Sequence, residues 1–344
     1  MPLRQVRLGS SGLKISPIVV GCMSYGSKDW SAWVQDDKEK IFSTLKFCYD
    51  NGLRTFDTAD MYSNGLSEKL LGEFLRKFNI RRETVVILTK VYFPVDEEIS
   101  LKHGGGNLSE HDILDLTNQQ GLSRKHILAG VAASCKRLGT YIDVLQIHRL
   151  DHDTSMEEVM RSLNHVVESG QVHYIGASTM LATEFVELQS IADKFGWHKF
   201  ISSQSCYNLL YREDERELIP YLKKHGVGII PWSPNARGIL CRPVSQQSES
   251  TRFTTDRTIT ARGFDDLQTQ DVEIINRVEE LAKKHGVSMA VVSSAWVLAK
   301  GAFPIVGLSS VDRVKEIILA TELQLSEEEI KYLEQPYLPK PLIC

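Results

Sequence analysis

Residues 52–62 read GLRTFDTADMY and contain, in order, a helix stop, a buried strand and a polar loop. Asn51-Gly52 ends the helical pattern of Lys38–Tyr49, because glycine readily adopts the left-handed backbone that closes a helix. The short run Arg54–Phe56 predicts a strand buried on both faces, and Asp57 follows it directly. The same order recurs along the chain, and this repetition decides the fold.

Short runs rich in branched apolar residues alternate with longer helical patterns. The predicted strands are Ile18–Val20, Arg54–Phe56, Val85–Thr89, Asp143–Ile147, Tyr174–Ala177, Ile201–Ser205, Val227–Pro231 and Ile305–Val306. The clearest predicted helices are Lys38–Tyr49, Ser67–Lys77, Arg124–Leu138, Met156–Glu168, Thr183–Phe195, Glu213–Lys224, Asp271–Lys284 and Val311–Ala320. Strands that alternate with helices in this way predict a parallel α/β architecture.

Two parallel architectures compete for such a pattern. An open doubly wound sheet usually carries G-x-G-x-x-G after its first strand, and the chain lacks that motif there. Eight strand–helix repeats over 344 residues fit a closed barrel better. We therefore predict a (β/α)₈ TIM barrel, a single domain over residues 1–344, with extended loops on its C-terminal face.

Two stretches interrupt the alternation. One runs from Phe93 to about Leu122 and includes Gly104-Gly105-Gly106, and the other runs from about Cys241 to Gln270. Both follow strands and so fall on the C-terminal face, where barrel enzymes build their sites, which favours a lid or a clasp over a ligand. The alternative for Ser245–Ala261 is a disordered insertion.

The composition excludes several classes of protein. Charged residues make up 24% of the chain, the net charge is −4, and no basic block indicates binding to nucleic acid or to an anionic membrane. No long apolar run follows the first basic residues, so we expect no secretory signal, and no apolar run approaches the length of a transmembrane helix. Scattered cysteines without a C-x-x-C pair indicate reduced thiols. We expect a cytoplasmic protein, a monomer or a weak homo-oligomer.

Ionisable residues follow three successive predicted strands. Asp57 ends the second strand and Tyr62 lies in the loop after it, while Lys90 and His148 end the third and fourth strands. A carboxylate at a strand end is more often a helix cap or a loop anchor, and a lone histidine is more often a hydrogen-bonded wall residue. Three successive strands that all end in such residues favour catalysis, because strand ends meet in one sector of the barrel mouth.

The four side chains suit the reduction of a carbonyl group. A free tyrosine has a pKa of about 10 and is a poor acid at neutral pH. We expect the Lys90 ammonium to lower the pKa of Tyr62, and Asp57 to keep Lys90 charged. His148 would donate a hydrogen bond to the carbonyl oxygen and help bear the charge that develops there. This chemistry needs no metal.

Two near-motifs are set aside. Residues 21–28, GCMSYGSK, resemble a phosphate-binding P-loop, but Ser27 separates the glycine from the lysine and Asp29 follows. His148 and His152 are four residues apart, as metal ligands can be, but no third ligand accompanies them. We predict no metal site.

The chain resembles the aldo-keto reductases, and among them fungal reductases of the aryl-alcohol dehydrogenase type. The resemblance runs from Leu13-Lys14-Ile15-Ser16-Pro17 to Pro304-Ile305-Val306-Gly307, and includes residues 170–178, GQVHYIGAS. The family's catalytic residues fall on Asp57, Tyr62, Lys90 and His148. The resemblance implies an NADPH-dependent reduction of small-molecule aldehydes and ketones to alcohols, with Tyr62 as the general acid.

The resemblance also implies a set of contacts to the cofactor. Ser178 and Gln204 would bind the nicotinamide carboxamide, although the family's usual Asn is Thr179 here, and Trp232 would stack on the nicotinamide. The alternative for Trp232 is a buried barrel aromatic. The segment Ser233–Leu240 resembles the loop that clasps the pyrophosphate. The expected cofactor contacts are Met23, Asp57, Ser178, Gln204, Trp232, Ser233, Asn235, Arg237, Ser309 and Arg313.

Ser309 and Arg313 stand where the family binds the adenosine 2′-phosphate. Hydroxyl and guanidinium groups suit a dianion, so NADPH is favoured over NADH. The family's familiar Lys is missing, and Ile317 replaces an Asn that often contacts adenine.

The substrate pocket is predicted to be aromatic, which suits aldehydes and aryl or alkyl ketones better than sugars. The expected substrate contacts are Tyr25, Trp30, Trp33, Phe93 and Trp296. Trp296 lies in an amphipathic pattern, Val291–Leu298, so packing is the alternative for this residue.

Two rival functions stay open. One is a regulatory subunit that holds NADPH with little turnover, although all four catalytic residues are retained. The other is a phosphate-binding barrel isomerase or an aldolase, in which Lys90 would form a Schiff base with the substrate.

Overall fold

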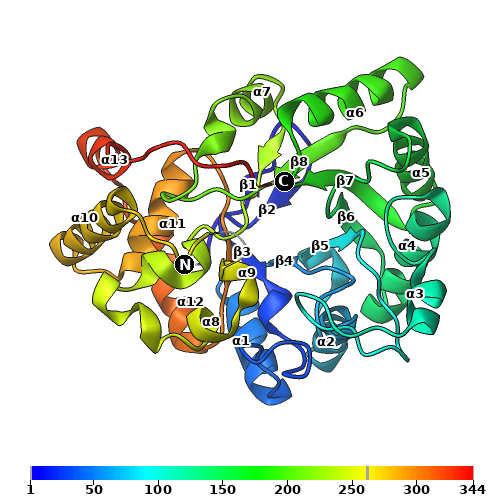
Figure 1. Cartoon of the computed structure of the whole chain (residues 1–344), viewed down its shortest axis with the longest axis horizontal. Helices are drawn as coiled ribbons and strands as arrows, with labels where there is room; N and C mark the ends of the chain where they lie inside the picture. The colour runs from blue at the N-terminus through cyan, green and yellow to red at the C-terminus, as the bar shows by residue number, and fades with distance from the viewer. Residues whose placement is uncertain (1, 261–262, 344) are drawn as a thin grey trace.

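The computed structural model describes residues 2–260 and 263–343. Parallel strands form one curled sheet in the order β10-β3-β4-β5-β6-β7-β8-β9, with helices around it (Figure 1). The strands of this sheet are β3 (Val19–Gly21), β4 (Thr55–Asp57), β5 (Val86–Val91), β6 (Ile142–Ile147), β7 (Val172–Ser178), β8 (Phe200–Gln204), β9 (Gly228–Ile229) and β10 (Ile305–Gly307). All eight predicted strands are present, with ends shifted by a few residues.

The sheet closes on itself between β9 and β10. Phe303 N–H donates to the Ile229 carbonyl at 2.8 Å, and Ile305 N–H donates to the Pro231 carbonyl at 3.0 Å. A regular parallel ladder would add a bond from the N–H of residue 231, but proline has none. The predicted (β/α)₈ barrel is therefore confirmed, with one seam that carries fewer hydrogen bonds.

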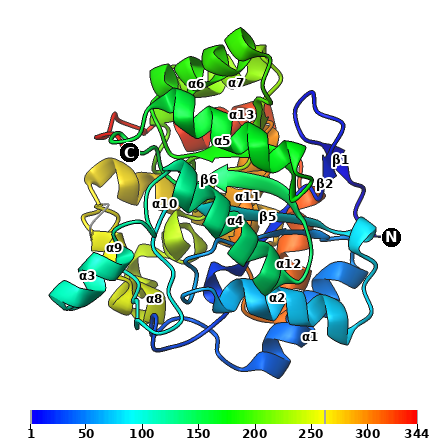
Figure 2. The same ribbon diagram turned by 90° about the vertical axis from the view of Figure 1, so that its right-hand side faces the viewer.

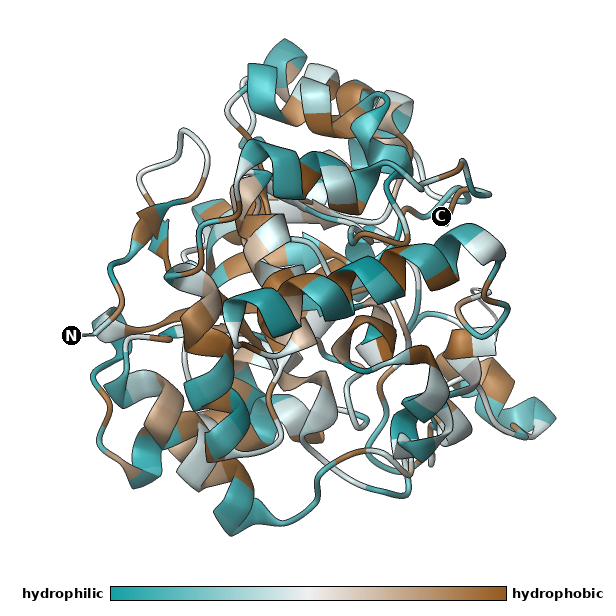
Figure 3. Cartoon of the chain, turned by 90° about the vertical axis from the view of Figure 1, so that its left-hand side faces the viewer, coloured by the Kyte–Doolittle hydropathy of each residue, from teal (hydrophilic) through white to brown (hydrophobic). Residues whose placement is uncertain are grey.

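Helices pack around the barrel, and those that the sequence predicts begin and end close to the expected residues. They are α1 (Lys38–Asp50), α2 (Leu66–Lys77), α3 (Glu110–Leu116), α4 (Arg124–Leu138), α5 (Met156–Glu168), α6 (Ala182–Phe195), α7 (Leu218–Lys224), α8 (Thr251–Thr255), α9 (Arg257–Thr260), α10 (Thr269–His285), α11 (Met289–Ala299), α12 (Val311–Ile318) and α13 (Glu327–Glu334). The predicted helix Glu213–Lys224 is wrong in its first part, where a separate 3₁₀ turn, Glu213–Glu215, precedes α7. In Figure 3 the outer helices carry both hydrophilic and hydrophobic segments, as amphipathic helices do on a core.

Inward-facing side chains fill the barrel in layers. The lower interior is apolar and includes Val19, Leu88, Val144, Ile230 and Ile305. Side chains alternate along a strand, so the next inward residue on β5 is Lys90 and on β6 is Gln146. The layer at the C-terminal ends of these strands is therefore polar, directly above an apolar one.

A short hairpin closes the opposite end of the barrel. Its strands are β1 (Val6–Arg7) and β2 (Lys14–Ile15), which pair antiparallel. Leu8 and Ile15 are fully buried against the apolar layer. Figure 2 shows this hairpin at the end of the molecule away from α3, α8 and α9, so the site can open only at the C-terminal face.

The two insertions lie on that C-terminal face and contain helices. The first includes α3, whose N-cap Ser109 forms a capping box with Asp112. The second includes a 3₁₀ segment, Val244–Glu249, followed by α8 and α9. The disordered alternative for Ser245–Ala261 is thus wrong for residues 245–260, and Ala261 lies outside the described residues.

Within residues 2–260 and 263–343, no helix is both long enough and apolar enough to span a membrane. The cysteines of the described ranges, Cys22, Cys48, Cys135, Cys206 and Cys241, are free thiols.

Candidate active site

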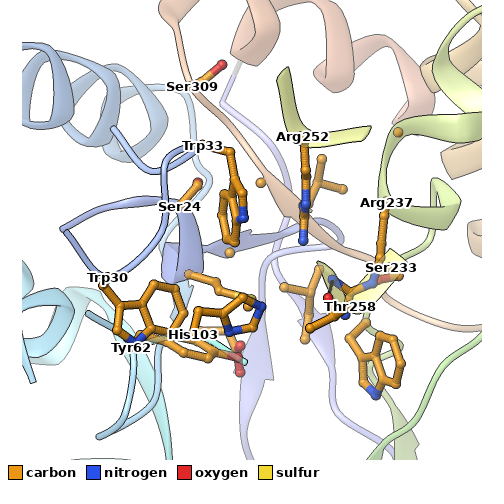
Figure 4. A pocket seen from close by; sticks show the side chains of 18 of the residues that line it. Ser24, Trp30, Trp33, Tyr62, His103, Ser233, Arg237, Arg252, Thr258 and Ser309 are labelled. Atoms are coloured by element: carbon orange, nitrogen blue, oxygen red, sulfur yellow. Dashed lines mark hydrogen bonds between the residues drawn. The ribbon is translucent and has the colours of Figure 1, made fainter. Parts of the chain in front are cut away.

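A cavity of about 1030 Å³ opens at the C-terminal ends of the strands. Its volume lies at the upper end of the range for ligand sites, about 300–1,000 Å³, so it can hold more than one small molecule. Figure 4 shows Trp30, Tyr62 and His103 gathered on one side of this cavity, and Arg237, Ser233 and Thr258 on another. The barrel strands supply its base, and the two insertions supply much of its rim.

Asp57, Lys90 and Tyr62 meet at the base of the cavity. Lys90 Nζ donates to Asp57 Oδ1 at 2.6 Å, to the Thr58 carbonyl at 2.8 Å and to Tyr62 Oη at 3.3 Å. Asp57 and Lys90 are 2% and 1% exposed, so this ion pair is shielded from water. Asp57 and Lys90 lie on neighbouring strands β4 and β5, which explains why the sequence could place them together.

The electrostatics confirm one expectation and correct another. Burial lowers the pKa of Lys90, but Asp57 and Tyr62 attract its ammonium, and the net pKa is raised above the usual value. Lys90 is therefore charged at neutral pH, as expected. Burial raises the pKa of Tyr62, and Lys90 lowers it only in part, so the net pKa is raised. The expected lowering of the Tyr62 pKa is wrong, because the cost of desolvating the phenolate outweighs the attraction of the ammonium.

His148 lies beside Tyr62 and lines the cavity. Its ring meets the Tyr62 ring edge to face, with centroids 5.9 Å apart, and meets the Phe93 ring at 5.1 Å. Its backbone N–H donates to the Val91 carbonyl at 3.1 Å, which ties the strand end in place. His152 is not part of this cluster, because it is exposed and its ring Nε2 lies 2.8 Å from Glu184 Oε1.

Two glutamines complete the buried cluster, and the sequence analysis identified only one of them. Gln204 Nε2 donates to Asp57 Oδ2 and to Gln146 Oε1, each at 2.8 Å. Gln146 Nε2 donates in turn to Asp57 Oδ2 at 3.2 Å. The signal missed in the sequence is a polar residue in the middle of the apolar run DVLQIH.

Trp232 is held against the cavity by the residue that replaces the family's Asn. Trp232 Nε1 donates to Thr179 Oγ1 at 3.0 Å, and Thr179 has a φ of 47°. This left-handed backbone is rare for a β-branched residue and is found mostly where the surroundings enforce it, as at functional sites. Ser178 Oγ donates to the main-chain carbonyl of Gln204 at 2.8 Å. Trp232 is thus partly exposed to the cavity and is not a fully buried barrel aromatic.

The second insertion contributes a carboxylate, Asp256, that binds two guanidinium groups. Asp256 Oδ2 accepts from Arg237 Nη1 at 2.8 Å and from Arg252 Nε at 3.1 Å. His103 of the first insertion lies 3.5 Å from Asp256 Oδ1, so this carboxylate connects both insertions. Burial raises the pKa of Asp256, but its hydrogen bonds and the two guanidinium groups lower it far below the ordinary range. Arg252 and His103 line the cavity and were not singled out in the sequence.

Ser309 and Arg313 line the far part of the cavity, and Asn235 and Ser233 lie along it. Asp312 forms an ion pair with Lys315, and in the described part of the chain no ion pair to Arg313 occurs. Arg242, which was not predicted, also lines the cavity. Burial raises the pKa of the neighbouring Cys241 thiol to about 11, although Arg313 and Arg242 lower it in part.

The predicted substrate contacts divide into two groups. Trp30, Trp33 and Phe93 line the cavity, as does Met23 of the predicted cofactor set. Tyr25 does not: it is buried and its hydroxyl donates to the Leu308 carbonyl. Trp296 is also buried, and its Nε1 donates to Glu334 Oε1 at 2.9 Å.

These two positions are corrections to the expected substrate set. Trp296 lies in α11, which is buried along most of its length, so the helix is not amphipathic as the sequence suggested. Its indole packs beside the Tyr207 ring, with centroids 5.0 Å apart. An aromatic residue near a strand end can face the outer core as easily as the barrel mouth, and sequence spacing does not distinguish the two.

A buried carboxylate, ammonium and phenol thus lie together at the C-terminal ends of the barrel strands, which is where enzymes of this architecture place their active sites. The sequence compares with known families in the same sense: residues 17–337 match the Aldo/keto reductase family. The chain belongs to this family of oxidoreductases.

Its relatives include several fungal proteins. It is 63% identical to "Putative aryl-alcohol dehydrogenase AAD16" of Saccharomyces cerevisiae, over 99% of each chain. It is 51% identical to versiconal hemiacetal acetate reductase of Aspergillus parasiticus, over 99% of this chain and 98% of the other. Among solved structures, a thermostable aldo-keto reductase crystallised with the inhibitor epalrestat aligns with a TM-score of 0.73 at 25% identity, over 97% of this chain and 100% of that one.

Proposed function

We propose that this protein reduces aldehydes and ketones to alcohols with NADPH, and that Tyr62 is the general acid. One observation carries the proposal: Lys90 Nζ joins Asp57 Oδ1 at 2.6 Å and Tyr62 Oη at 3.3 Å at the base of a cavity of about 1030 Å³. A phenol beside a buried ammonium can release its proton to an adjacent oxygen and is stabilised afterwards as the phenolate. The family and its relatives support carbonyl compounds as the substrate class.

The residues present fit a phosphorylated nicotinamide cofactor. The cavity has an aromatic side chain, Trp232, near the catalytic cluster, and basic side chains toward the rim. Arg237 and Arg252 would bind the pyrophosphate, and Arg313 with Ser309 the 2′-phosphate, by charge-assisted hydrogen bonds. When bound, NADPH supplies the hydride that reduces the carbonyl carbon.

The chain's own residues supply and stabilise the proton. Burial keeps Tyr62 protonated at neutral pH, so the phenol is ready to donate its proton to an oxygen that gains negative charge. The Lys90 ammonium then balances the charge of the phenolate. Asp57 holds this ammonium in place and keeps it protonated. His148, beside Tyr62, orients the substrate oxygen and shares the developing charge. The aromatic rings of Trp30 and Phe93 bound the same space and exclude water.

The Schiff-base alternative fits the geometry less well. An amine must lose its proton to attack a carbonyl, and the attraction of Asp57 keeps the pKa of Lys90 above its usual value. The regulatory alternative differs from the proposal only in turnover, so an activity assay decides it.

The test is a panel of aldehydes and ketones assayed with NADPH and with NADH, followed by the loss of absorbance of the reduced nicotinamide. We expect substrate-dependent oxidation, faster with NADPH. Tight NADPH binding without turnover on any carbonyl would support the regulatory subunit. Borohydride trapping of a carbonyl compound on Lys90 would support the aldolase.

A further inference from the structure

Gln146 is a fully buried polar side chain that neither binds substrate nor lines the cavity. It lies on β6 opposite Lys90 of β5 and Gly176 of β7. Both ends of its amide are occupied: Nε2 donates to Asp57 Oδ2 at 3.2 Å, and Oε1 accepts from Gln204 Nε2 at 2.8 Å. A buried amide with both ends bound is fixed in one orientation, because rotating it would lose both bonds.

The orientation of Gln146 determines the orientation of Gln204. An amide nitrogen has two hydrogens, and Gln204 uses them on Asp57 Oδ2 and Gln146 Oε1, each at 2.8 Å. The carbonyl oxygen of Gln204 therefore points away from both partners, and Gln204 lines the cavity. Without an acceptor at position 146, one hydrogen of this buried amide would be left without a partner.

The neighbouring strand makes room for this arrangement. A Cβ atom at Gly176 would lie 2.5 Å from Ser202 Oγ and 3.2 Å from Gln146 Cγ. A side chain at position 176 would clash with Ser202 and would also crowd the stem of Gln146, so glycine at this position leaves room for both side chains.

We propose that Gln146 is a positioning residue that holds the side-chain oxygen of Gln204, Oε1, toward the cavity. There Gln204 Oε1 accepts a hydrogen bond from the carboxamide NH₂ of the nicotinamide. This inference rests on the proposed nicotinamide cofactor and adds the residue that determines how the ring is recognised. The site then distinguishes a pyridine ring that carries a primary amide from one that carries an acetyl group. The acetyl ring has the same shape and the same carbonyl, but it lacks the N–H donors.

The test compares the binding of NADP⁺ and of its 3-acetylpyridine analogue, measured by quenching of tryptophan fluorescence. One hydrogen bond contributes about 0.5–1.5 kcal/mol, so we expect the wild-type protein to favour NADP⁺ by roughly three- to tenfold. Gln146→Met keeps the volume and removes the acceptor, and the ratio should fall to nearly one. Gln146→Glu, protonated beside the Asp57 carboxylate, keeps an oxygen opposite Gln204 Nε2 and an O–H donor to Asp57, and most of the preference should return.

Gln189→Met is the matched control. Gln189 is also a buried glutamine with both amide ends bound, to the Phe200 N–H and carbonyl, but it lies on α6 and is not among the described cavity-lining residues. It should lose stability and keep the ratio. If Gln146→Met does not fold, Gln146→Asn, whose shorter amide cannot reach both partners, serves in its place.

The outcomes separate the inference from the proposed function. Equal weakening of both ligands by the position-146 variants means a structural role only and overturns the inference. A wild-type protein that binds NADP⁺ with no preference over the analogue also overturns it, and the proposed function stands. A wild-type protein that binds neither ligand overturns both.

Discussion

The two halves of the cavity are built differently. At and directly beneath its base, Asp57, Lys90, Gln146 and Gln204 lie on strands and bind one another through buried side chains. At its rim, Arg237 and Arg252 lie in or beside the second insertion and share one carboxylate, Asp256. The side chains of this cluster satisfy one another's hydrogen bonds, so the base is preorganised for chemistry. At the rim, a phosphate group can replace Asp256 as the partner of Arg237 and Arg252, so the rim is suited to binding a phosphorylated ligand.

This difference predicts that substitutions in the base change turnover, and substitutions in the rim change affinity. The largest effect is expected for Tyr62→Phe, which removes the proton donor and keeps the ring. General acid catalysis contributes about 10²–10⁴-fold, so kcat should fall by that factor. NADPH affinity, measured by fluorescence quenching, should stay within about twofold. If kcat decreases by less than about tenfold while hydride transfer is rate-limiting, Tyr62 is not the general acid.

His148→Ala tests the base at the substrate oxygen. The loss of one preorganised donor to a developing oxyanion costs on the order of 10²–10³-fold, so kcat/KM for aldehydes should fall by that factor. NADPH binding should change little, because the proposed partner of His148 is the substrate. An unchanged kcat/KM would exclude His148 from the mechanism. His152→Ala, at an exposed position, is the control.

Arg313→Ala tests the rim at the proposed 2′-phosphate site. A charge-assisted hydrogen bond contributes roughly 1.5–3 kcal/mol, which corresponds to about a 10- to 100-fold loss of affinity. NADPH should show this loss, NADH should be nearly unaffected, and kcat at saturation should be unchanged. Titration of both cofactors decides the point, since equal shifts for the two would contradict the assignment.

Asp256→Asn should have the smallest effect. The change weakens the connection between the insertions through His103 and also frees Arg237 and Arg252 for phosphate, and the two effects oppose each other. We expect NADPH dissociation to change by less than about tenfold, with kcat for single-turnover hydride transfer unaltered. Stopped-flow release of NADPH measures the first quantity. A large loss in single-turnover rate would mean that the rim also shapes the chemistry.

The sequence predicted the strand-borne part of the site and missed much of the loop-borne part, for physical reasons. Strand ends meet at one edge of a parallel sheet, so Asp57, Lys90 and His148 could be placed together from the pattern alone. The contacts of His103 and Arg252 depend on how two insertions fold over each other, which no periodicity encodes. Tyr25 and Trp296 were misplaced because an apolar ring suits a pocket wall and an outer core equally well.

The pKa of Tyr62 shows the same limit in another form. Neighbouring charges can be guessed from strand register, and the Lys90–Asp57 pair was. The cost of burying the phenolate depends on how completely the surrounding rings exclude water, and Tyr62 is only 8% exposed. The sequence indicates the direction in which each neighbouring charge shifts the Tyr62 pKa, but it does not indicate whether desolvation is the larger effect.

The proline in the closing seam has a consequence for local opening. Between β9 and β10 the structure gives two backbone hydrogen bonds, and Pro231 cannot donate the one that would lie between them. We expect amide hydrogens at this seam, such as those of Phe303 and Ile305, to exchange with solvent sooner than those inside β6. Trp232 follows Pro231 directly, so a ligand stacked on its ring would hold the seam shut and slow that exchange. The barrel would then open locally next to its ligand site, and ligand binding would reduce that opening.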